Sequence, residues 1–297
     1  MANQRRVILP NAFCLAGATA TGKSAVAQLL AERLSGSVLS ADAMLVYQGL
    51  DIGTAKPTVA ERHDVPYFGV DCVTPAEDFS AAAWLDEAER AAALARPCIV
   101  AGGPGLYFSV LLRGLDPAPP SNPALRAELE ACSLAELQAR LAATGNTIAD
   151  PSNPRRLVRA LEILASGAAL PSGWQTREKP ALTALTWDRA LLHQRIARRV
   201  DEMYAAGLLE EAETARRKYP VWSQTAAQAI GYAEAFAVLD GTCSLAEAKE
   251  RTVIRTRQLA RRQETYLRGQ FEVTWVRGEV GDTVETLANR VAEAWQL

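Results

Sequence analysis

The stretch Gly17-Ala18-Thr19-Ala20-Thr21-Gly22-Lys23-Ser24 decides the fold, because it fits the pattern G-x-x-x-x-G-K-[ST] of a phosphate-binding loop. The apolar residues 12–16 before it predict a buried strand, and residues 24–34 after it place apolar side chains on one helical stripe. Glycines in the loop let backbone N–H groups point at phosphate oxygens. Lys23 adds a full positive charge, and the Ser24 hydroxyl suits a phosphate-bound Mg²⁺ ion. The alternative, an ordinary glycine- and alanine-rich turn, does not explain the flanking strand and helix.

The composition excludes several classes of protein. The chain has 297 residues, 49% of them hydrophobic, and a formal net charge of −2, so any polyanion must be held by local patches rather than by overall charge. The five cysteines are scattered without a C-x-x-C pair, which argues against a zinc site or a disulfide framework. No stretch approaches the roughly 18 apolar residues that span a bilayer. We therefore expect a cytoplasmic protein without membrane contact. We also expect a monomer.

The N-terminal region imitates a secretory signal, with Arg5-Arg6, an apolar run and the small residues 18–20. Pro10 and Asn11 interrupt the apolar run, and cleavage at residues 18–20 would destroy the phosphate loop. We therefore expect no such signal.

The region 1–114 alternates short apolar runs with helical patterns, which is typical of a parallel sheet with crossover helices. Residues 37–40 and 97–101 read as further strands, and residues 79–95 as an amphipathic helix. Ligands of such sheets bind at the carboxyl ends of the strands, where Gly17, Asp42 and Gly102 are expected to meet. The predicted fold class is α/β, a P-loop NTPase-like parallel sheet flanked by helices.

A proline-rich linker at residues 115–120 begins a different region. From there to about residue 175 the pattern is helical, and a return to the sheet follows at 184–187. Long helices are expected at 189–218 and 245–268. We therefore predict a catalytic core of residues 1–114 and 176–297, with a helical insertion domain at 115–175.

Two sets of charged residues follow from this arrangement. Asp42 closes a strand opposite the phosphate loop, where a carboxylate can hold Mg²⁺ through water or accept a proton, or can merely cap a turn. Arginines dominate the predicted helix at 245–268, and guanidinium groups bind phosphate bidentately, although a solvated helix face is the alternative. These arginines are Arg251, Arg255, Arg257, Arg261, Arg262 and Arg268. A smaller basic cluster of Arg155, Arg156 and Arg159 opens a helix in the insertion, and either binds a nucleic-acid backbone or is simply solvated.

Several motifs follow the phosphate loop over nearly the whole chain. They are Ser40-Ala41-Asp42-Ala43-Met44-Leu45-Val46-Tyr47, Asp51-Ile52-Gly53-Thr54-Ala55-Lys56-Pro57, Gly102-Gly103-Pro104-Gly105-Leu106-Tyr107, Arg159-Ala160-Leu161-Glu162, Ala229-Ile230-Gly231-Tyr232 and Thr256-Arg257-Gln258-Leu259-Ala260-Arg261-Arg262-Gln263. In this order they resemble the motifs of the bacterial tRNA dimethylallyltransferases. The second and last of them are far more specific than the phosphate loop alone.

The resemblance implies transfer of a dimethylallyl group from dimethylallyl diphosphate to N6 of the adenosine adjacent to the anticodon of tRNA, with release of pyrophosphate. In this family the loop, here Gly17 to Ser24, holds a diphosphate rather than ATP. The aspartate that corresponds to Asp42 takes the proton from the adenine amine. Lys23, Mg²⁺ and the arginine that corresponds to Arg257 stabilise the departing pyrophosphate. The target base must be flipped out to reach this site.

The resemblance also implies contacts with tRNA, and the insertion is expected to grip the anticodon arm. The corresponding positions are Asp42, Ala43, Met44, Leu45, Pro104, Arg126, Arg155, Arg156, Arg159, Gly231, Tyr232, Arg261, Arg262 and Arg268.

The chain departs from the family pattern at two hydroxyl-bearing positions, because Pro104 replaces a threonine and Ala43 replaces a serine. Three alternatives stay open. The first is prenyl transfer to a free AMP-type nucleotide, which would need neither the insertion nor its basic cluster. The second is an ATP-dependent small-molecule kinase. The third is a catalytically weak RNA-binding paralogue, for which Pro104 and Ala43 speak.

Overall fold

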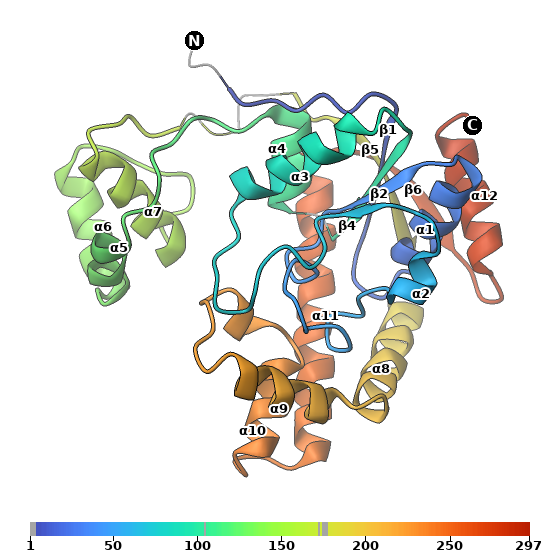
Figure 1. Cartoon of the computed structure of the whole chain (residues 1–297). Coiled ribbons are helices and arrows are strands. Elements are labelled where there is room, and N and C mark those ends of the chain that lie inside the picture. The colour runs from blue at the N-terminus through green and yellow to red at the C-terminus, as the bar shows by residue number, and fades with distance from the viewer. Residues whose placement is uncertain (1–3, 104, 172, 174–177) are drawn as a thin grey trace. The chain divides into compact units, whose positions relative to one another are not determined.

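The computed structural model describes residues 4–103, 105–171, 173 and 178–297, and the chain divides into two compact units (Figure 1). The core unit consists of Arg6–Arg113 and Glu178–Leu297, and the helical unit of Met1–Arg5 and Gly114–Arg177. The internal boundaries lie within two residues of those predicted. The N-terminal residues differ: Arg5 exchanges backbone hydrogen bonds of 3.0 and 2.9 Å with Leu115. Gln4 and Arg5 group with the helical unit, whereas the prediction assigned residues 1–114 to the core.

A parallel sheet forms the centre of the core unit. Its strands in the described residues are β1 (Ala12–Gly17), β2 (Ser37–Ser40), β3 (Tyr67–Phe68), β4 (Cys98–Gly102), β5 (Ala181–Trp187) and β6 (Glu272–Gly278). They are ordered β3-β2-β4-β1-β5-β6, and every neighbouring pair is parallel. The interior strands β2 and β4 are buried along their whole length, and burial on both faces explains the nearly continuous apolar sequence of β4. The predicted α/β fold class is confirmed.

Helices cover the sheet on both faces (Figure 1). On one side α1 (Lys23–Arg33) packs against α12 (Val284–Ala294), and on the other α3 (Ala81–Ala93) packs against α4 (Leu106–Arg113). Helix α3 begins two residues after the predicted start, because the Ser80 hydroxyl caps it by accepting a hydrogen bond from the backbone N–H of Ala83. A single turn, α2 (Val59–Arg62), precedes β3.

A second group of helices extends from the strands (Figure 1): α8 (Arg189–Ala205), α9 (Leu208–Lys218), the 3₁₀ turn η1 (Ala226–Gln228), α10 (Tyr232–Leu239) and α11 (Leu245–Gln270). The single helix predicted at 189–218 is wrong, because Gly207 adopts φ 100° and separates α8 from α9. This group shares an apolar cluster with residues 46–50 of the segment after β2. The helices thus support that segment.

The helical unit contains α5 (Pro123–Glu130), α6 (Leu134–Ala143) and α7 (Pro154–Ala165). Leucines from all three form its small core, among them Leu129, Leu137 and Leu157. Each helix starts at a side-chain cap, and α5 and α7 carry proline in the first turn. No helix in the described part of either unit has both the length and the apolar composition to cross a membrane.

Candidate active site

The phosphate loop connects β1 to α1 in a conformation that its sequence allows. A Cβ atom on Gly17 would lie 2.8 Å from the Thr21 hydroxyl oxygen, and Gly22 adopts φ 92°. Both positions therefore require glycine. The Thr21 hydroxyl closes the loop by donating to the carbonyl oxygen of Ala18 at 2.9 Å. Ala20, a non-glycine residue, also has a positive φ, 65°.

Two residues of the core unit hold the loop from outside. The Nε of Arg195, on α8, donates to the carbonyl oxygen of Ala20 at 2.8 Å, and its guanidinium lies 4.2 Å from the centroid of the Trp187 ring. The indole of Trp187 donates to the carbonyl oxygen of Thr21 at 2.9 Å. With its carbonyls bound in this way, the loop keeps a fixed shape.

The carboxyl ends of neighbouring strands bring the predicted segments together. Ala16 of β1 is in register with Gly102 of β4, and Ala101 of β4 with Ser40 of β2. A Cβ atom on Gly102 would lie 2.4 Å from the carbonyl carbon of Ala41, so only glycine lets the two strand ends approach. The phosphate loop, the segment that begins with Asp42 and the Gly102-Gly103 turn thus meet at one edge of the sheet.

Lys23 and Asp42 share this edge. Lys23 is buried, and its Nζ donates to the carbonyl oxygen of Ala18 at 3.3 Å. Burial lowers the pKa of Lys23 from 10.5 to about 8, with the Asp42 charge opposing that shift and Arg199 adding to it. A buried ammonium without a full counter-charge is a site for an anion.

Asp42 is partly buried, and one of its oxygens has a structural role. Its Oδ1 accepts a hydrogen bond from the backbone N–H of Met44 at 2.9 Å. Burial raises the pKa of the nearby Tyr107, and the negative charge of Asp42 raises it further. Asp42 thus caps its turn and also presents a negative charge beside Lys23.

Arg199 is a site residue that the sequence did not reveal. Burial lowers the pKa of this arginine of α8, and the charge of Asp42 opposes the shift. Its Nη2 donates to the carbonyl oxygen of Thr54 at 3.3 Å. No local motif marks Arg199, because only the packing of α8 against the segment after β2 brings it there.

Helix α11 contributes Arg257 and Gln263. Within the described residues, the Nε of Arg257 is buried and has no hydrogen-bond partner, an arrangement that costs about 1–3 kcal/mol. An oxyanion would satisfy it. Burial and the charges of Arg257 and Arg189 lower the pKa of His193. The side-chain oxygen of Gln263 accepts from the backbone N–H of Thr19 at 2.9 Å, which joins α11 directly to the phosphate loop.

The other arginines of α11 differ in their surroundings. Arg255 forms an ion pair with Glu234 and donates a hydrogen bond to the carbonyl oxygen of Gln228, so its guanidinium already has partners within the protein. The guanidinium of Arg268 lies over the ring of Trp275, at 4.6 Å from its centroid. The exposed members are Arg251, Arg261, Arg262 and Arg268.

Some predicted tRNA contacts of the core unit are buried. Tyr232 has no exposed surface and Leu45 only 8%, so neither of these two side chains lies on the surface. Gly231 adopts φ 97° and begins α10. Ala43 is exposed and Met44 partly so. Pro104 lies outside the described residues.

In the helical unit, Arg126 and Arg159 are paired internally with Glu162. An Arg126 nitrogen lies 2.6 Å from that carboxylate and an Arg159 nitrogen 3.5 Å from it. Burial raises the pKa of Glu162, but hydrogen bonds from Arg126 and Ser121 and both arginine charges outweigh it, so the pKa is lowered. Arg155 and Arg156 are exposed at the start of α7, where an Arg156 nitrogen lies 3.9 Å from the Asp150 carboxylate.

A loop with two glycines between β1 and α1, with a buried lysine and an aspartate at the end of the next strand, is the arrangement of the P-loop-like α/β class of proteins. Two models of known protein families match this chain and identify its family within this class. The model described as IPP transferase matches residues 45–270, and the model described as isopentenyl transferase matches residues 10–66.

Known proteins are similar to this chain in sequence or structure over almost its whole length. A tRNA dimethylallyltransferase from Anaeromyxobacter dehalogenans is 44% identical, covering 94% of this chain and 96% of its own, and one from Stenotrophomonas maltophilia is 39% identical, covering 90% and 92%. The crystal structure of a tRNA isopentenylpyrophosphate transferase from Bacillus halodurans superposes with a TM-score of 0.68 at 32% identity over 96% and 97% of the two chains. A similar enzyme from Staphylococcus epidermidis gives 0.70 at 29% identity over 97% and 99%. The chain therefore belongs to the IPP transferase family, as the sequence motifs predicted.

Proposed function

We propose that this protein transfers a dimethylallyl group from dimethylallyl diphosphate to N6 of the adenosine adjacent to the anticodon of tRNA. One observation carries the proposal: in a member of this family, a buried lysine of the phosphate loop and the carboxylate of Asp42 share one edge of the sheet. Neither a free AMP-type acceptor, nor a kinase reaction, nor a catalytically weak paralogue is favoured by any relative that we compared.

The chain's residues suit a displacement at the allylic carbon. The adenine nitrogen forms a bond to that carbon while the bond to the diphosphate oxygen breaks, and negative charge develops on the departing pyrophosphate. Loop N–H groups, Lys23 and Arg257 stabilise this charge, an effect worth about 3–4 kcal/mol for a single well-placed donor. Asp42 takes the proton that the amine loses. All four groups come from the core unit.

The residues fit a Mg²⁺ ion that is held mainly by the substrate. Ser24 is exposed in the first turn of α1, and among the described residues no three His, Cys, Asp or Glu side chains gather as a metal site. Mg²⁺ in phosphate-transfer sites commonly keeps several waters and binds substrate oxygens with few protein ligands. Ser24 would supply its hydroxyl, and the bound ion would add positive charge at the diphosphate.

The tRNA contacts remain proposals at the exposed positions. Arg155 and Arg156 of the helical unit, and Arg261 and Arg262 of α11, offer guanidinium groups to phosphates. We also propose that the protein acts as a monomer in the cytoplasm, where its free cysteines would stay reduced.

The test is incubation of the protein with labelled dimethylallyl diphosphate, Mg²⁺ and unmodified tRNA, with AMP as a competitor. We expect label on one adenosine of the anticodon loop, identified by nuclease digestion and mass spectrometry, and no loss of that label when AMP is present. Label on AMP alone would favour the free-nucleotide acceptor. Tight tRNA binding without any incorporation would contradict the proposed activity.

A further inference from the structure

A long segment without regular structure separates β2 from α2. It covers residues 41–58 and has Asp42 as its second residue, so its shape decides where that carboxylate lies. Irregular segments of this length in a compact unit need contacts that hold them. Part of this support is the apolar cluster that Val46, Tyr47 and Leu50 share with the helices of the second group.

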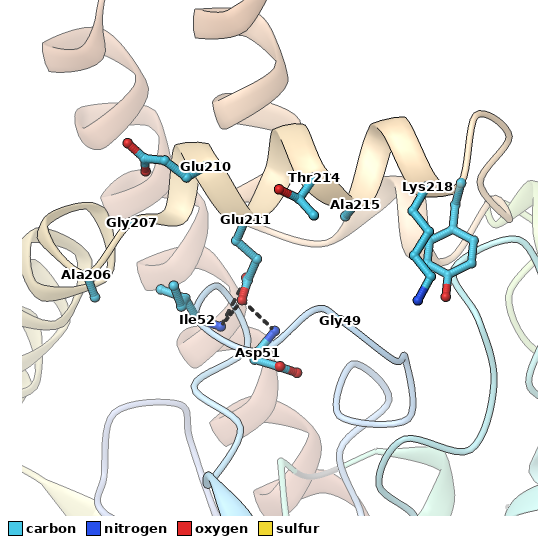
Figure 2. Close-up of a pocket in the computed structure, with 11 residues that line it drawn as sticks. Gly49, Asp51, Ile52, Ala206, Gly207, Glu210, Glu211, Thr214, Ala215 and Lys218 are labelled. Carbon is cyan, nitrogen blue, oxygen red and sulfur yellow. Dashed lines mark hydrogen bonds between the residues drawn. The ribbon is translucent and has the colours of Figure 1, made fainter.

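The polar support comes largely from Glu211 on α9. Its carboxylate accepts hydrogen bonds from three successive backbone N–H groups: Asp51 at 3.2 Å, Ile52 at 2.9 and 3.0 Å, and Gly53 at 3.4 Å. Figure 2 shows Glu211 reaching from the helix to this backbone, beside a cleft of about 620 Å³ that Asp51 and Ile52 also line. Successive N–H groups that converge on one anion form a strong charge-assisted site. Here a side chain of the protein itself fills it.

Tyr232 completes the arrangement. Its hydroxyl donates to the same Glu211 carboxylate, and its buried ring lies against Gly53. A Cβ atom at position 53 would lie 2.4 Å from that ring, so the backbone and the ring are in direct contact. We call the arrangement of Glu211, Tyr232 and the N–H groups of residues 51–53 the Glu211 clamp.

The segment beyond the clamp connects to the active site. The carbonyl oxygen of Thr54 accepts a hydrogen bond from Arg199 at 3.3 Å; the charge of Arg199 lowers the pKa of Lys23, and the charge of Asp42 raises the pKa of Arg199. Two residues further, the buried Nζ of Lys56 binds the carbonyl oxygen of Tyr47 at 2.6 Å and the carboxylates of Asp51 and Asp71. A displacement of residues 51–54 would therefore move the carbonyl that orients Arg199.

We infer that Glu211 is a positioning residue for the transfer reaction, acting through residues 51–54 and Arg199 on the Lys23–Asp42 site. The inference rests on the proposed function. Glu211 touches neither substrate, and its effect is geometric: a displacement of about 1 Å at reacting groups can cost around a hundredfold in rate.

The test compares Glu211→Gln with Glu210→Gln in the full-length protein. Glu210 is the neighbouring, exposed carboxylate of the same helix, so its variant changes the charge equally without touching the clamp. We expect Glu211→Gln to slow single-turnover transfer at saturating donor and tRNA at least tenfold, with the tRNA Kd within threefold, at a temperature where both variants are folded. Hydrogen exchange should quicken at residues 51–53 in this variant alone.

A merely structural role would lower Tm without slowing transfer per folded molecule, so equal rates in the two variants would overturn the inference. Combination with Arg199→Lys tests the route. If Glu211 acts through Arg199, the double variant transfers no more than threefold slower than the slower single variant, whereas multiplied losses would overturn this route. A wild-type protein that transfers no dimethylallyl group would refute the proposed function itself, which separates the two failures.

Discussion

At the scale of single residues, the site depends on the positive charge of Lys23, which burial makes easier to lose because it lowers the pKa of the ammonium group. Burial and the charge of Arg199 lower the pKa of Lys23, and the charge of Asp42 opposes this shift. An incoming diphosphate would supply the missing negative charge, so the free protein is prepared for an anion. The Asp42 carboxylate also accepts a hydrogen bond from the backbone N–H of Met44, which fixes the position of the proposed base relative to the backbone.

Asp42→Asn should separate chemistry from binding. Asparagine keeps an oxygen for the N–H of Met44 but cannot take a proton at neutral pH, so we expect transfer to fall about 10²- to 10⁴-fold. The tRNA Kd, measured by filter binding, should stay within threefold. Asp64→Asn, at an exposed position, is the matched control. Full activity of the Asp42 variant would remove this residue from the mechanism.

The lowered pKa of Lys23 predicts that donor affinity depends on pH. The pKa of Lys23 in the free protein is about 8, so the side chain loses its proton as the pH rises through that value. If the diphosphate requires the charged form, pyrophosphate should bind roughly tenfold more weakly at pH 9 than at pH 7. Calorimetric titration measures this ratio. In Lys23→Arg, whose side chain stays protonated, the ratio should fall towards one, and an equal ratio in both proteins would contradict the assignment.

At the scale of secondary structure, α11 joins several parts of the core unit. It starts at a capping box formed by Ser244 and Glu247 and runs for 26 residues. Along its length it pairs Arg255 with Glu234 of α10, buries the Nε of Arg257 and holds the phosphate loop through Gln263. One rigid helix thus supplies both a proposed anion ligand and a direct contact to the loop.

Arg257→Ala should weaken pyrophosphate binding without loss of stability. A hydrogen bond to a charged group contributes about 1.5–3 kcal/mol, which corresponds to roughly 10- to 150-fold in Kd. Because the Nε of Arg257 has no partner in the described residues, its removal should leave Tm unchanged or raise it. Lys249→Ala, on the same helix, removes an equal charge and should leave pyrophosphate binding alone. An unchanged Kd in the Arg257 variant would exclude this arginine as a ligand.

At the scale of the whole molecule, a core unit built on a parallel sheet is combined with a small helical unit that has its own apolar core. The net charge of −2 gives no general attraction to RNA. We therefore expect recognition of tRNA to depend on local arginines. Arg126 and Arg159 pair with the buried Glu162, whereas Arg155 and Arg156 are exposed at the start of α7, with Arg156 3.9 Å from the Asp150 carboxylate.

Replacing both Arg155 and Arg156 by alanine should weaken tRNA binding in a salt-dependent way. Each phosphate contact contributes about 0.7–0.9 to the slope of log K against log salt, so we expect the slope to fall by between one and two. Arg140→Ala in α6, where the arginine pairs with Glu128, is the control with an intact slope. Equal slopes for wild type and the double variant would show that these arginines do not contact the RNA.

The sequence by itself determined the phosphate loop, the strands β1, β2 and β4, the insertion and the family, because each depends on residues that are contiguous or nearly so. A strand, a tight turn and a helix start are local, and so is a run of motifs in fixed order. The two-residue strand β3 and the edge strand β6 were missed, as was the break at Gly207. Only the tertiary structure decided that Tyr232 is buried and that Arg126 forms an ion pair with Glu162. The same holds for the hydrogen bonds by which Arg199, Gln263 and Glu211 bind the backbone around the site. The reason is physical: burial, ion pairing and the capture of backbone N–H groups depend on which distant segments pack together, and one chain's local pattern does not encode those partners.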